Sequence, residues 1–451
     1  MMSLERKSRR AFLKGAGIAA GSGLVASMLP ANAGAQANSP AKGATKPLLP
    51  QFEGFGIPAE DRDEFWSKVR SHFSLDPQLT FLNNGTLGPA SDFVVKTREY
   101  YDTLLAKDPT NNFRVKELAE VRAGLASVLN AKDGEASITH ATTEGMNIFA
   151  HGLDWKAGDE VIVGDQEHFG ATEPYKTLAQ RIGIKIVTVK LPVPAESVEQ
   201  VVAAYAQAFT PRTRVLVVSH VSYVTGLVAP LRELAELAHK NGALITVDGA
   251  QSFGVLPVDV AATNIDHFAG SGQKWFLAGT GTGVHYVRKD LQASLWPLYG
   301  YDDPGQKTST RYERSGQFGI PASLGLGAAV QFYNAIGSQR IADKAIRLGK
   351  LVRESAQTLP GARVISSPDP ALQGNINVFT LPSNLPLQQV VATLGEQEHI
   401  VVRSVSFGQI SGLRVSTHYY NNASEVERLF AVLARWSKDP SLLPPTEKRT
   451  S

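Results

Sequence analysis

Two neighbouring stretches decide the fold of this chain: residues 244–254, LITVDGAQSFG, and residues 270–283, GSGQKWFLAGTGTG. In the first stretch an apolar run ends at Asp248, and in the second Lys274 follows another short apolar run. In open α/β sheets, ligands bind beyond the carboxyl ends of the strands. We therefore expect Asp248 and Lys274 to meet at that edge of a sheet, either as a simple ion pair or as part of a binding site.

Short apolar runs of the same kind recur on both sides of these stretches, separated by amphipathic segments with leucines at helical spacing. Residues 230–238 are one such helical segment, and Gly242 follows as a stop signal. Alternation of strand and helix predicts a large, mostly parallel α/β sheet covered on both faces. The predicted strands are residues 136–140, 160–164, 185–189, 214–219, 243–247, 267–271 and 283–287.

After Pro321 the pattern changes. Two long helices, the first through Ile336 and the second through Leu359, precede strands at 377–381, 400–403 and 414–417. A last helix is expected from a cap near Ser424 to about Trp436. This mixture predicts a smaller α+β domain. The predicted divisions are a segment at 51–95 that joins the small domain, a large domain at 96–320, the small domain at 321–440 and a tail at 441–451.

The first 37 residues have the anatomy of an export signal. A charged start precedes an apolar run from Gly15 to Leu29, and small residues at 33–37 offer cleavage sites. The run is too short and glycine-rich for a membrane-spanning helix. Residues 8–14, SRRAFLK, resemble the twin-arginine signal, the alternative being a basic N-terminus that matches by chance. We predict a signal peptide at 1–37, a linker at 38–50, export by the twin-arginine translocon and a periplasmic location.

Charge and cysteine content exclude two classes of function. Five of the 45 basic residues and one of the 42 acidic residues lie in residues 1–37, so the net charge of +3 belongs to the signal. The rest of the chain is close to neutral, which argues against binding of nucleic acid. The chain contains no cysteine. A cysteine nucleophile and a thiolate-bound metal are therefore excluded, and we expect no metal site.

The residues around Asp248 and Lys274 resemble the class V aminotransferases, a family of fold-type I enzymes that depend on pyridoxal 5'-phosphate. That family has a strand-ending Asp, a Gln three residues later, and a Ser-x-x-Lys at the next strand end. Here these positions are Asp248, Gln251, Ser271 and Lys274. The resemblance covers roughly residues 80–436. It implies a large PLP-binding sheet domain with a smaller α+β domain, small-molecule or peptide amino substrates, and a homodimer.

The resemblance also gives these residues roles. Lys274 would form the Schiff base with the cofactor aldehyde, and desolvation would lower its pKa to supply the free amine. Asp248 would face the pyridine nitrogen and keep it protonated, so that the ring withdraws electrons. Gln251 would hydrogen-bond the ring hydroxyl.

Two further segments match the family at the cofactor. Thr142 and Thr143 open a predicted helix, where backbone amides attract anions, and with Ser271 they would bind the cofactor phosphate. The alternative for the threonines is ordinary N-capping. His168 follows a strand in GDQEHFGAT (164–172), and by resemblance it would stack on the cofactor ring. The alternative is a histidine with a structural role.

Two matches concern the substrate. Arg414, in GLRVSTHYYN (412–421), matches the arginine that grips the substrate α-carboxylate, for which guanidinium is suited. The alternative is an exposed arginine in a salt bridge. Asn84, in FLNNGTLGP (81–89), lies in a segment that resembles the family's entry segment, and it would touch the substrate. A turn-forming Asn-Gly explains the same residues.

The chain departs from the family pattern at three positions. Gln273 stands where a histidine often precedes the lysine, and Tyr223 stands where relatives often have Asn or Ser. Gln317 replaces a threonine that reaches the phosphate of the partner subunit. Two interpretations remain for three further arginines: they select an acidic side group of the substrate, or they are surface residues. These are Arg311, Arg314 and Arg403.

The choice of reaction is narrowed by exclusion. The desulfurases of the family use a cysteine nucleophile, which this chain lacks. Transamination, epimerisation and cleavage at the β-carbon remain. The motifs resemble the isopenicillin N epimerase-like branch, and the leader resembles that of periplasmic family members that tailor siderophores. We predict a transaminase-like enzyme acting on an amino acid or a peptide-linked amino group. The alternative of another class is a member that binds the cofactor without catalysis.

Overall fold

The computed structural model describes residues 49–112, 114–299, 308–317 and 319–443. These residues belong to one compact unit. The predicted signal peptide at 1–37 lies outside the described residues, as do most of the linker and of the tail.

The largest sheet has seven strands in the order β2-β8-β7-β6-β5-β3-β4. Strands β3 to β7 run parallel, whereas β8 is antiparallel to both of its neighbours. Each predicted strand of this sheet is present, close to its expected bounds. The strands are β2 (Ala136–Thr139), β3 (Glu160–Gly164), β4 (Lys185–Val189), β5 (Thr213–Ser219), β6 (Leu244–Asp248), β7 (His267–Ser271) and β8 (Gly283–Val287).

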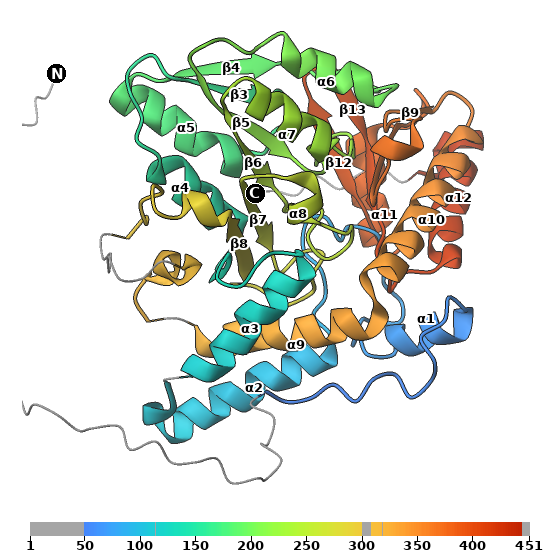
Figure 1. Ribbon diagram of the computed structural model, residues 1–451. Coiled ribbons are helices and arrows are strands. Elements are labelled where there is room, and N and C mark those ends of the chain that lie inside the picture. Colours follow the sequence, from blue (N-terminus) through green and yellow to red (C-terminus); the bar gives the residue numbers. More distant parts are fainter. Residues whose placement is uncertain (1–48, 113, 300–307, 318, 444–451) are drawn as a thin grey trace, which may run out of the picture. The chain divides into compact units, whose positions relative to one another are not determined.

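Helices cover both faces of this sheet. Val161 and Val163 on β3 pack in a cluster with residues of α4 (Thr142–Gly152) and α5 (Phe169–Ile182). Ile162, between them, joins the cluster that contains residues of α7 (Leu231–Lys240). Figure 1 shows α4 and α5 beside one face of the sheet and α7 toward the other. Since successive strand residues point to opposite faces, the continuous apolar runs reflect burial on both sides.

A second sheet, antiparallel and of four strands, has the order β12-β13-β10-β9. It lies beside α10 (Ser338–Gln357) and α12 (Ala423–Lys438) (Figure 1). This α+β part of the fold agrees with the prediction, and the domain boundaries stay predictions. The strands are β9 (Arg363–Val364), β10 (Ile376–Thr380), β12 (Arg403–Phe407) and β13 (Ile410–Ser416).

The predicted cap of the last helix is wrong by two residues. Asn422 has an extended backbone, and its side chain accepts a hydrogen bond from the N–H of Glu425 at 3.0 Å. The Glu425 side chain reaches back to the N–H of Asn422, which completes a capping box. Ser424 is already helical, and its hydroxyl donates to the Asn422 side chain. The side-chain amide of Asn422, and not the hydroxyl of Ser424, therefore caps α12.

The segment before the large sheet joins the C-terminal part of the chain. β1 (Thr80–Phe81) pairs in parallel with β11 (Ile400–Val401). Farther along, α2 (Asp92–Lys107) and α3 (Val115–Val128) lie against α9 (Ile320–Ile336) (Figure 1). The remaining helices are α1 (Asp63–Arg70), α6 (Val198–Ala206), α8 (Val260–Thr263) and α11 (Leu387–Glu396), and short 3-10 turns are η2 (Pro109–Asn112), η3 (Lys289–Leu291), η4 (Ser309–Glu313), η5 (Pro370–Leu372) and η6 (Pro440–Leu442).

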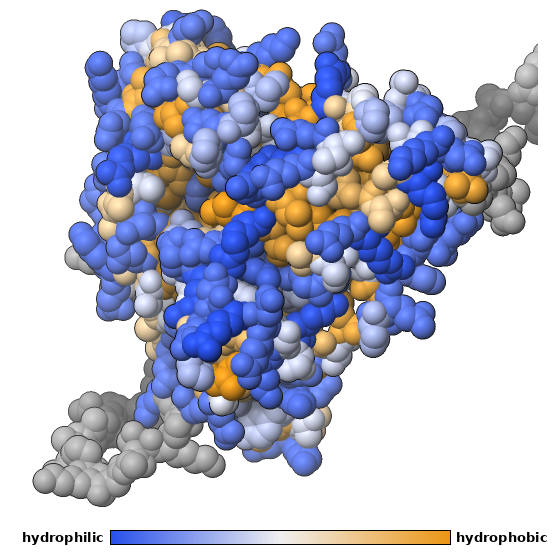
Figure 2. Space-filling view, turned by 90° about the vertical axis from the view of Figure 1, so that its right-hand side faces the viewer, coloured by the Kyte–Doolittle hydropathy of each residue, from blue (hydrophilic) through white to orange (hydrophobic). Residues whose placement is uncertain are grey.

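Apolar side chains remain at parts of the surface. Figure 2, which views the molecule from the side of α10 and α12, shows apolar groups gathered across the middle of this face, bordered by polar ones. Val115, Phe169 and Trp296 are among the exposed large apolar residues. None of the described helices combines the length and the apolar composition that a membrane crossing requires.

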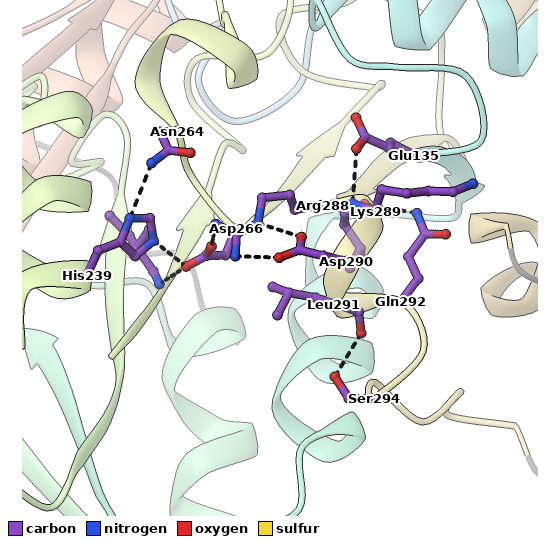
Figure 3. Close-up of polar contacts among 12 residues, drawn as sticks. Glu135, His239, Asn264, Asp266, Arg288, Lys289, Asp290, Leu291, Gln292 and Ser294 are labelled. Atoms are coloured by element: carbon purple, nitrogen blue, oxygen red, sulfur yellow. Dashed lines mark hydrogen bonds and ion pairs between the residues drawn. The ribbon is translucent and has the colours of Figure 1, made fainter. Parts of the chain in front are cut away.

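The amino-terminal ends of β6 and β7 hold a cluster of paired charges. Asp266 is fully buried, and its Oδ2 accepts the N–H of Ile245 at 2.8 Å and lies 3.0 Å from His239 Nε2. Its other oxygen forms an ion pair with Arg288, which in turn binds Asp290 at 2.7 Å. Figure 3 shows Asp266 between His239 and Arg288. Because the buried acid pairs with Arg288 and hydrogen-bonds with His239 of α7, this Asp266 cluster ties α7 to the sheet.

Candidate active site

Several predicted residues meet at the opposite, carboxyl edge of the large sheet. Asp248 is the last residue of β6, and Ser271 is the last residue of β7. Lys274 follows in the next loop, close enough to Asp248 that each charge shifts the pKa of the other. The structure therefore brings together the acid and the lysine that the sequence singled out, at the edge where α/β sheets bind ligands.

The loop that carries Lys274 is held at three consecutive carbonyls, those of residues 273–275. The first accepts the N–H of Gly88 at 2.9 Å, and the second accepts Asn84 Nδ2 at 3.1 Å. The third accepts His418 Nε2 at 2.7 Å. These donors come from segments far apart in the sequence. These hydrogen bonds fix the backbone from which the Lys274 side chain extends.

Asn84 supports this loop with its whole side chain. It is fully buried, and its Oδ1 accepts the hydroxyl of Tyr420 at 2.9 Å while its Nδ2 binds the Lys274 carbonyl. Both ends of the amide are therefore engaged within the chain, which makes Asn84 a positioning residue for Lys274. The contact with substrate that the sequence suggested stays a prediction.

The environment of Lys274 favours its neutral amine. Burial lowers the pKa of Lys274, and the positive charges of Arg414 and Arg403 act in the same direction. The negative charge of Asp248 opposes them. A neutral lysine amine is a nucleophile and a proton acceptor, whereas an ammonium is neither.

Asp248 and His168 lie in the same buried environment. Burial raises the pKa of Asp248, while the N–H of Ala250, at 2.9 Å from Oδ1, and the charges of Lys274 and His168 lower it. Burial also lowers the pKa of His168, which favours the neutral ring. His168 Nδ1 accepts the N–H of Gly170 at 3.1 Å and so caps α5, which leaves the proton of the neutral ring on Nε2. Nδ1 of His168 therefore has the structural role that was the alternative to cofactor binding. Stacking of the ring on a cofactor stays a prediction.

Gln251 is buried three residues after the end of β6. Its Nε2 donates to the carbonyl of Gly85 at 3.0 Å, and its Oε1 accepts the indole N–H of Trp275 at 2.8 Å. These contacts join the lysine loop to the turn at residues 83–86. They place Gln251 in the site, and its predicted bond to a ring hydroxyl stays a prediction.

The start of α4 is arranged to receive an anion. Its N-cap position is Ala141, which supplies no capping side chain, so the alternative of N-capping by Thr142 or Thr143 is wrong. The N–H of Thr142 donates to Ser271 Oγ at 3.0 Å, and the two hydroxyls lie 2.7 Å apart. Thr143 is exposed at the same helix start. Backbone donors and hydroxyls at a helix N-terminus are typical of phosphate sites.

Arg414 is buried, and it has no anionic partner in the part of the chain that the structure describes. It is 1% exposed, and its guanidinium donates to the carbonyl of Tyr223 at 3.3 Å, to Asn83 Oδ1 at 3.1 Å and to Thr86 Oγ1 at 3.2 Å. These acceptors are neutral, and its Nε has no partner among the described residues. Burial lowers the pKa of Arg414 to about 10. The alternative of an exposed salt-bridge arginine is wrong, and a buried unpaired charge indicates a site for a ligand anion.

The structure adds residues that sequence reasoning missed or left open. Thr86 accepts hydrogen bonds from Arg414 and, at 3.1 Å, from Arg403. The ring of Tyr223 lies edge-on to His168, with centroids 5.3 Å apart. A polar turn next to a strand was the only local signal for Thr86. Arg311, in contrast, donates to the carbonyl of Gln292 beyond the end of β8, at the opposite edge of the sheet.

This set of residues fits pyridoxal 5'-phosphate. The uncapped start of α4 with Ser271 would hold the phosphate, Lys274 would bind the aldehyde carbon, and Asp248 would face the ring nitrogen. When bound, the cofactor supplies a ring that withdraws electrons and stabilises negative charge at the substrate Cα.

Known proteins share this sequence pattern. The family model for aminotransferase class-V matches residues 93–429. Isopenicillin N epimerase from Amycolatopsis lactamdurans is 32% identical over 395 residues, which cover 83% of this chain and 99% of that protein. A probable cysteine desulfurase from Methanothermobacter thermautotrophicus is 30% identical over 339 residues, 70% of this chain and 82% of that protein.

Solved structures share the fold. The cystine C–S lyase C-DES, in complex with cysteine persulfide, has a TM-score of 0.73 and 26% identity, and the match covers 79% of this chain and 98% of that one. A mutant of C-DES with glycine covalently linked to its PLP cofactor also has a TM-score of 0.73, with 25% identity over 81% of this chain and 98% of that one. These neighbours confirm the fold-type I architecture and the cofactor. The chain belongs to the aminotransferase class-V family of pyridoxal 5'-phosphate enzymes.

Proposed function

We propose that this enzyme is an exported aminotransferase, which moves an amino group from an amino acid or a peptide-linked donor to a 2-oxo acid. The observation that carries the proposal is the buried, unpaired Arg414 beside Lys274. An arginine in this state suits a donor carboxylate, and an amine in this state suits proton transfer at the adjacent carbon. The reaction balances, because the donor becomes a 2-oxo acid as the acceptor becomes an amino acid.

The residues act in distinct ways in this reaction. Arg414 binds the donor carboxylate and thereby orients the bonds at Cα. Lys274 Nζ, favoured in its neutral form by burial, accepts the Cα proton and returns it at a later step. Asp248 would hold the ring nitrogen of the cofactor and favour its protonated form. The absence of cysteine leaves the chain without a thiolate for sulfur transfer, the chemistry named for its desulfurase relatives.

Two measurements on the purified holoenzyme test the proposal: product analysis with a panel of donors, and exchange of the donor Cα hydrogen in deuterated water. A panel of amino donors is incubated with a 2-oxo acid, and mass spectrometry follows both products. We expect a new 2-oxo acid and a new amino acid in equal amounts. Loss of a Cα hydrogen to deuterated water with neither product would overturn the aminotransferase, and complete inertness toward donors would support the non-catalytic alternative.

Epimerisation is the second candidate, because the isopenicillin N epimerase relative is covered over 99% of its length. An epimerase inverts the configuration at Cα without net transfer of nitrogen. Chiral chromatography of the donor after incubation separates the two reactions. Racemisation without a 2-oxo acid product would favour the epimerase, and release of ammonia from a β-substituted donor would favour a lyase.

The periplasmic location is also part of the proposal, and siderophore tailoring is one role it would allow. Residues 8–14 support export of a folded protein by the twin-arginine translocon. Replacing Arg9 and Arg10 together by lysine should leave a cofactor-loaded precursor in the cytoplasm, detected by fractionation. Normal export of this variant would refute the route.

A homodimer is the assembly that the family suggests. The exposed side chain of Phe169, next to His168, and the exposed Trp296 are apolar surface that a second subunit would cover. Light scattering of the purified holoenzyme tests this. A monomer at micromolar concentration would contradict it.

A further inference from the structure

We propose that Arg403 and Thr86 form a second anion-binding subsite beside Arg414, which selects amino donors whose side chain carries a carboxylate. The inference rests on the proposed function and names the substrate class of the same site.

The register of β12 and β13 places Arg403 directly opposite Arg414. Side chains directly opposite in an antiparallel pair lie on the same face. Both guanidinium groups donate to one oxygen, Thr86 Oγ1, at 3.1 Å from Arg403 and at 3.2 Å from Arg414. Two cations therefore converge on a single neutral acceptor.

This arrangement is unfavourable unless an anion completes it. Like charges directly opposite on a sheet destabilise it. The Thr86 hydroxyl donates to Asn83 Oδ1 at 3.0 Å, so the next group is also neutral. No ion pair to Arg403 or Arg414 occurs within the ranges that the structure describes. The smaller sheet thus holds two positive charges side by side without a counter-ion.

The charge of Arg403 also reaches the catalytic groups. Burial is the main reason for the lowered pKa values of Arg414 and Lys274, and Arg403 adds to both. The same holds for His168, where Lys274 contributes as well. Arg403 therefore faces the site, although its side chain is exposed.

A count of charges identifies the missing group. The α-carboxylate of a donor neutralises Arg414 and leaves Arg403 positive. Asp248 lies with Lys274 and His168, and burial raises the pKa of the nearby Glu167 to about 8, which favours its neutral form near pH 7. A carboxylate on the donor side chain is the group that balances Arg403. Since Arg414 is buried and Arg403 exposed, the α-carboxylate lies deep and the second carboxylate lies nearer the solvent.

Arg403→Gln tests the subsite, with Arg403→Lys as the conservative variant. Arg363→Gln is the matched control, because Arg363 is exposed at the opposite edge of the same sheet. Calorimetry on the full-length holoenzyme compares glutarate with butyrate, neither of which can react. Kinetics compare glutamate with glutamine and aspartate with asparagine.

We expect Arg403→Gln to weaken binding of glutarate, and to lower kcat/KM for the acidic donors relative to their amides, by about 10- to 100-fold. The readout is the ratio between each acidic donor and its amide, because loss of the Arg403 charge also acts on Lys274 and therefore on turnover of both donors. Binding of butyrate should weaken less than binding of glutarate, Arg403→Lys should lie between, and Arg363→Gln should match the unaltered protein. The subsite is overturned if the unaltered holoenzyme does not prefer glutarate to butyrate. It is also overturned if Arg363→Gln has the effect of Arg403→Gln.

The outcomes separate the two proposals. If the enzyme turns over donors, and Arg403→Gln does not change the ratio of kcat/KM between acidic donors and their amides, the subsite is refuted and the aminotransferase is supported. Glutarate binding that depends on Arg403, without turnover of any donor, supports the subsite and sinks the aminotransferase.

Discussion

The two ends of β6 and β7 hold buried charge in opposite ways. At the amino end, the Asp266 carboxylate has all of its partners inside the protein, namely His239, Arg288 and a backbone N–H (Figure 3). At the carboxyl end, Lys274 shares its surroundings with Arg414, whose partners are neutral. Because an unpaired buried charge is costly, the first cluster contributes to stability and the second is kept for a ligand.

Replacement of Lys274 by alanine should give the largest effect. We expect kcat to fall by at least about 10³-fold, within the range seen when a group that moves protons is removed. The free energy of unfolding should not fall, because burial of this ionisable side chain disfavours its charged form and the chain loses that cost with it. Kinetics and urea denaturation measure the two quantities, and Lys176→Ala, an exposed lysine, is the control. Borohydride that still fixes the cofactor to the Lys274→Ala protein would show that another lysine binds it.

Replacement of Asp266 by alanine should lower stability and leave catalysis nearly unchanged. We expect the free energy of unfolding to fall by about 3 kcal/mol, at the low end for a broken buried pair because His239 and Arg288 are partly hydrated. The kcat/KM of the folded protein should change little. Asp290→Ala removes a 65% exposed partner of Arg288 and should cost less than about 1 kcal/mol. Equal losses for the two variants would contradict a structural role for the buried acid.

Arg414→Gln should separate function from stability. We expect kcat/KM to fall by about 100-fold, as a charge-assisted bond to the donor carboxylate is lost. The free energy of unfolding should stay equal or rise, because the arginine is buried and unpaired. Calorimetric unfolding and donor kinetics measure both, and Arg414→Lys should recover part of the activity. A loss of stability as large as that of Asp266→Ala would mean that Arg414 is a structural charge.

A smaller effect concerns Glu167, near Asp248. Burial raises its pKa to about 8, the charges of Asp248 and Asp165 add to the rise, and the Ser219 hydroxyl, 2.5 Å away, opposes it. The unfolded carboxyl titrates near pH 4.3, so between these values the folded state binds more protons and stability falls as pH rises. From pH 6.5 to 7.5 we expect a fall of about 1 kcal/mol.

Glu167→Gln should remove this slope, and Glu354→Gln, at an exposed glutamate, should retain it. Urea denaturation of each protein at the two pH values measures the difference. The same slope in the Glu167→Gln protein would assign the pH dependence to another group.

Much of the sheet and the heart of the site could be predicted because their signals are local. A buried strand requires a run of apolar residues, so LITVD and HFAGS mark their strands without knowledge of their neighbours. Asp248 and Lys274 follow directly from the ends of those strands. The cap at Asn422 was missed because neighbouring Asn and Ser are both good caps, and only the backbone conformation distinguishes them.

The sequence by itself thus determined the order of the strands along the chain and the identity of the lysine and the acid. Tertiary structure decided which distant residues support and complete them. Asn84 and His418 bind the lysine loop. Arg403 pairs with Arg414 across two strands, and Asp266 hydrogen-bonds with His239. The physical reason is that strand registers and loop contacts depend on the packing of the whole fold, whereas an apolar run and its final polar residue are properties of adjacent residues.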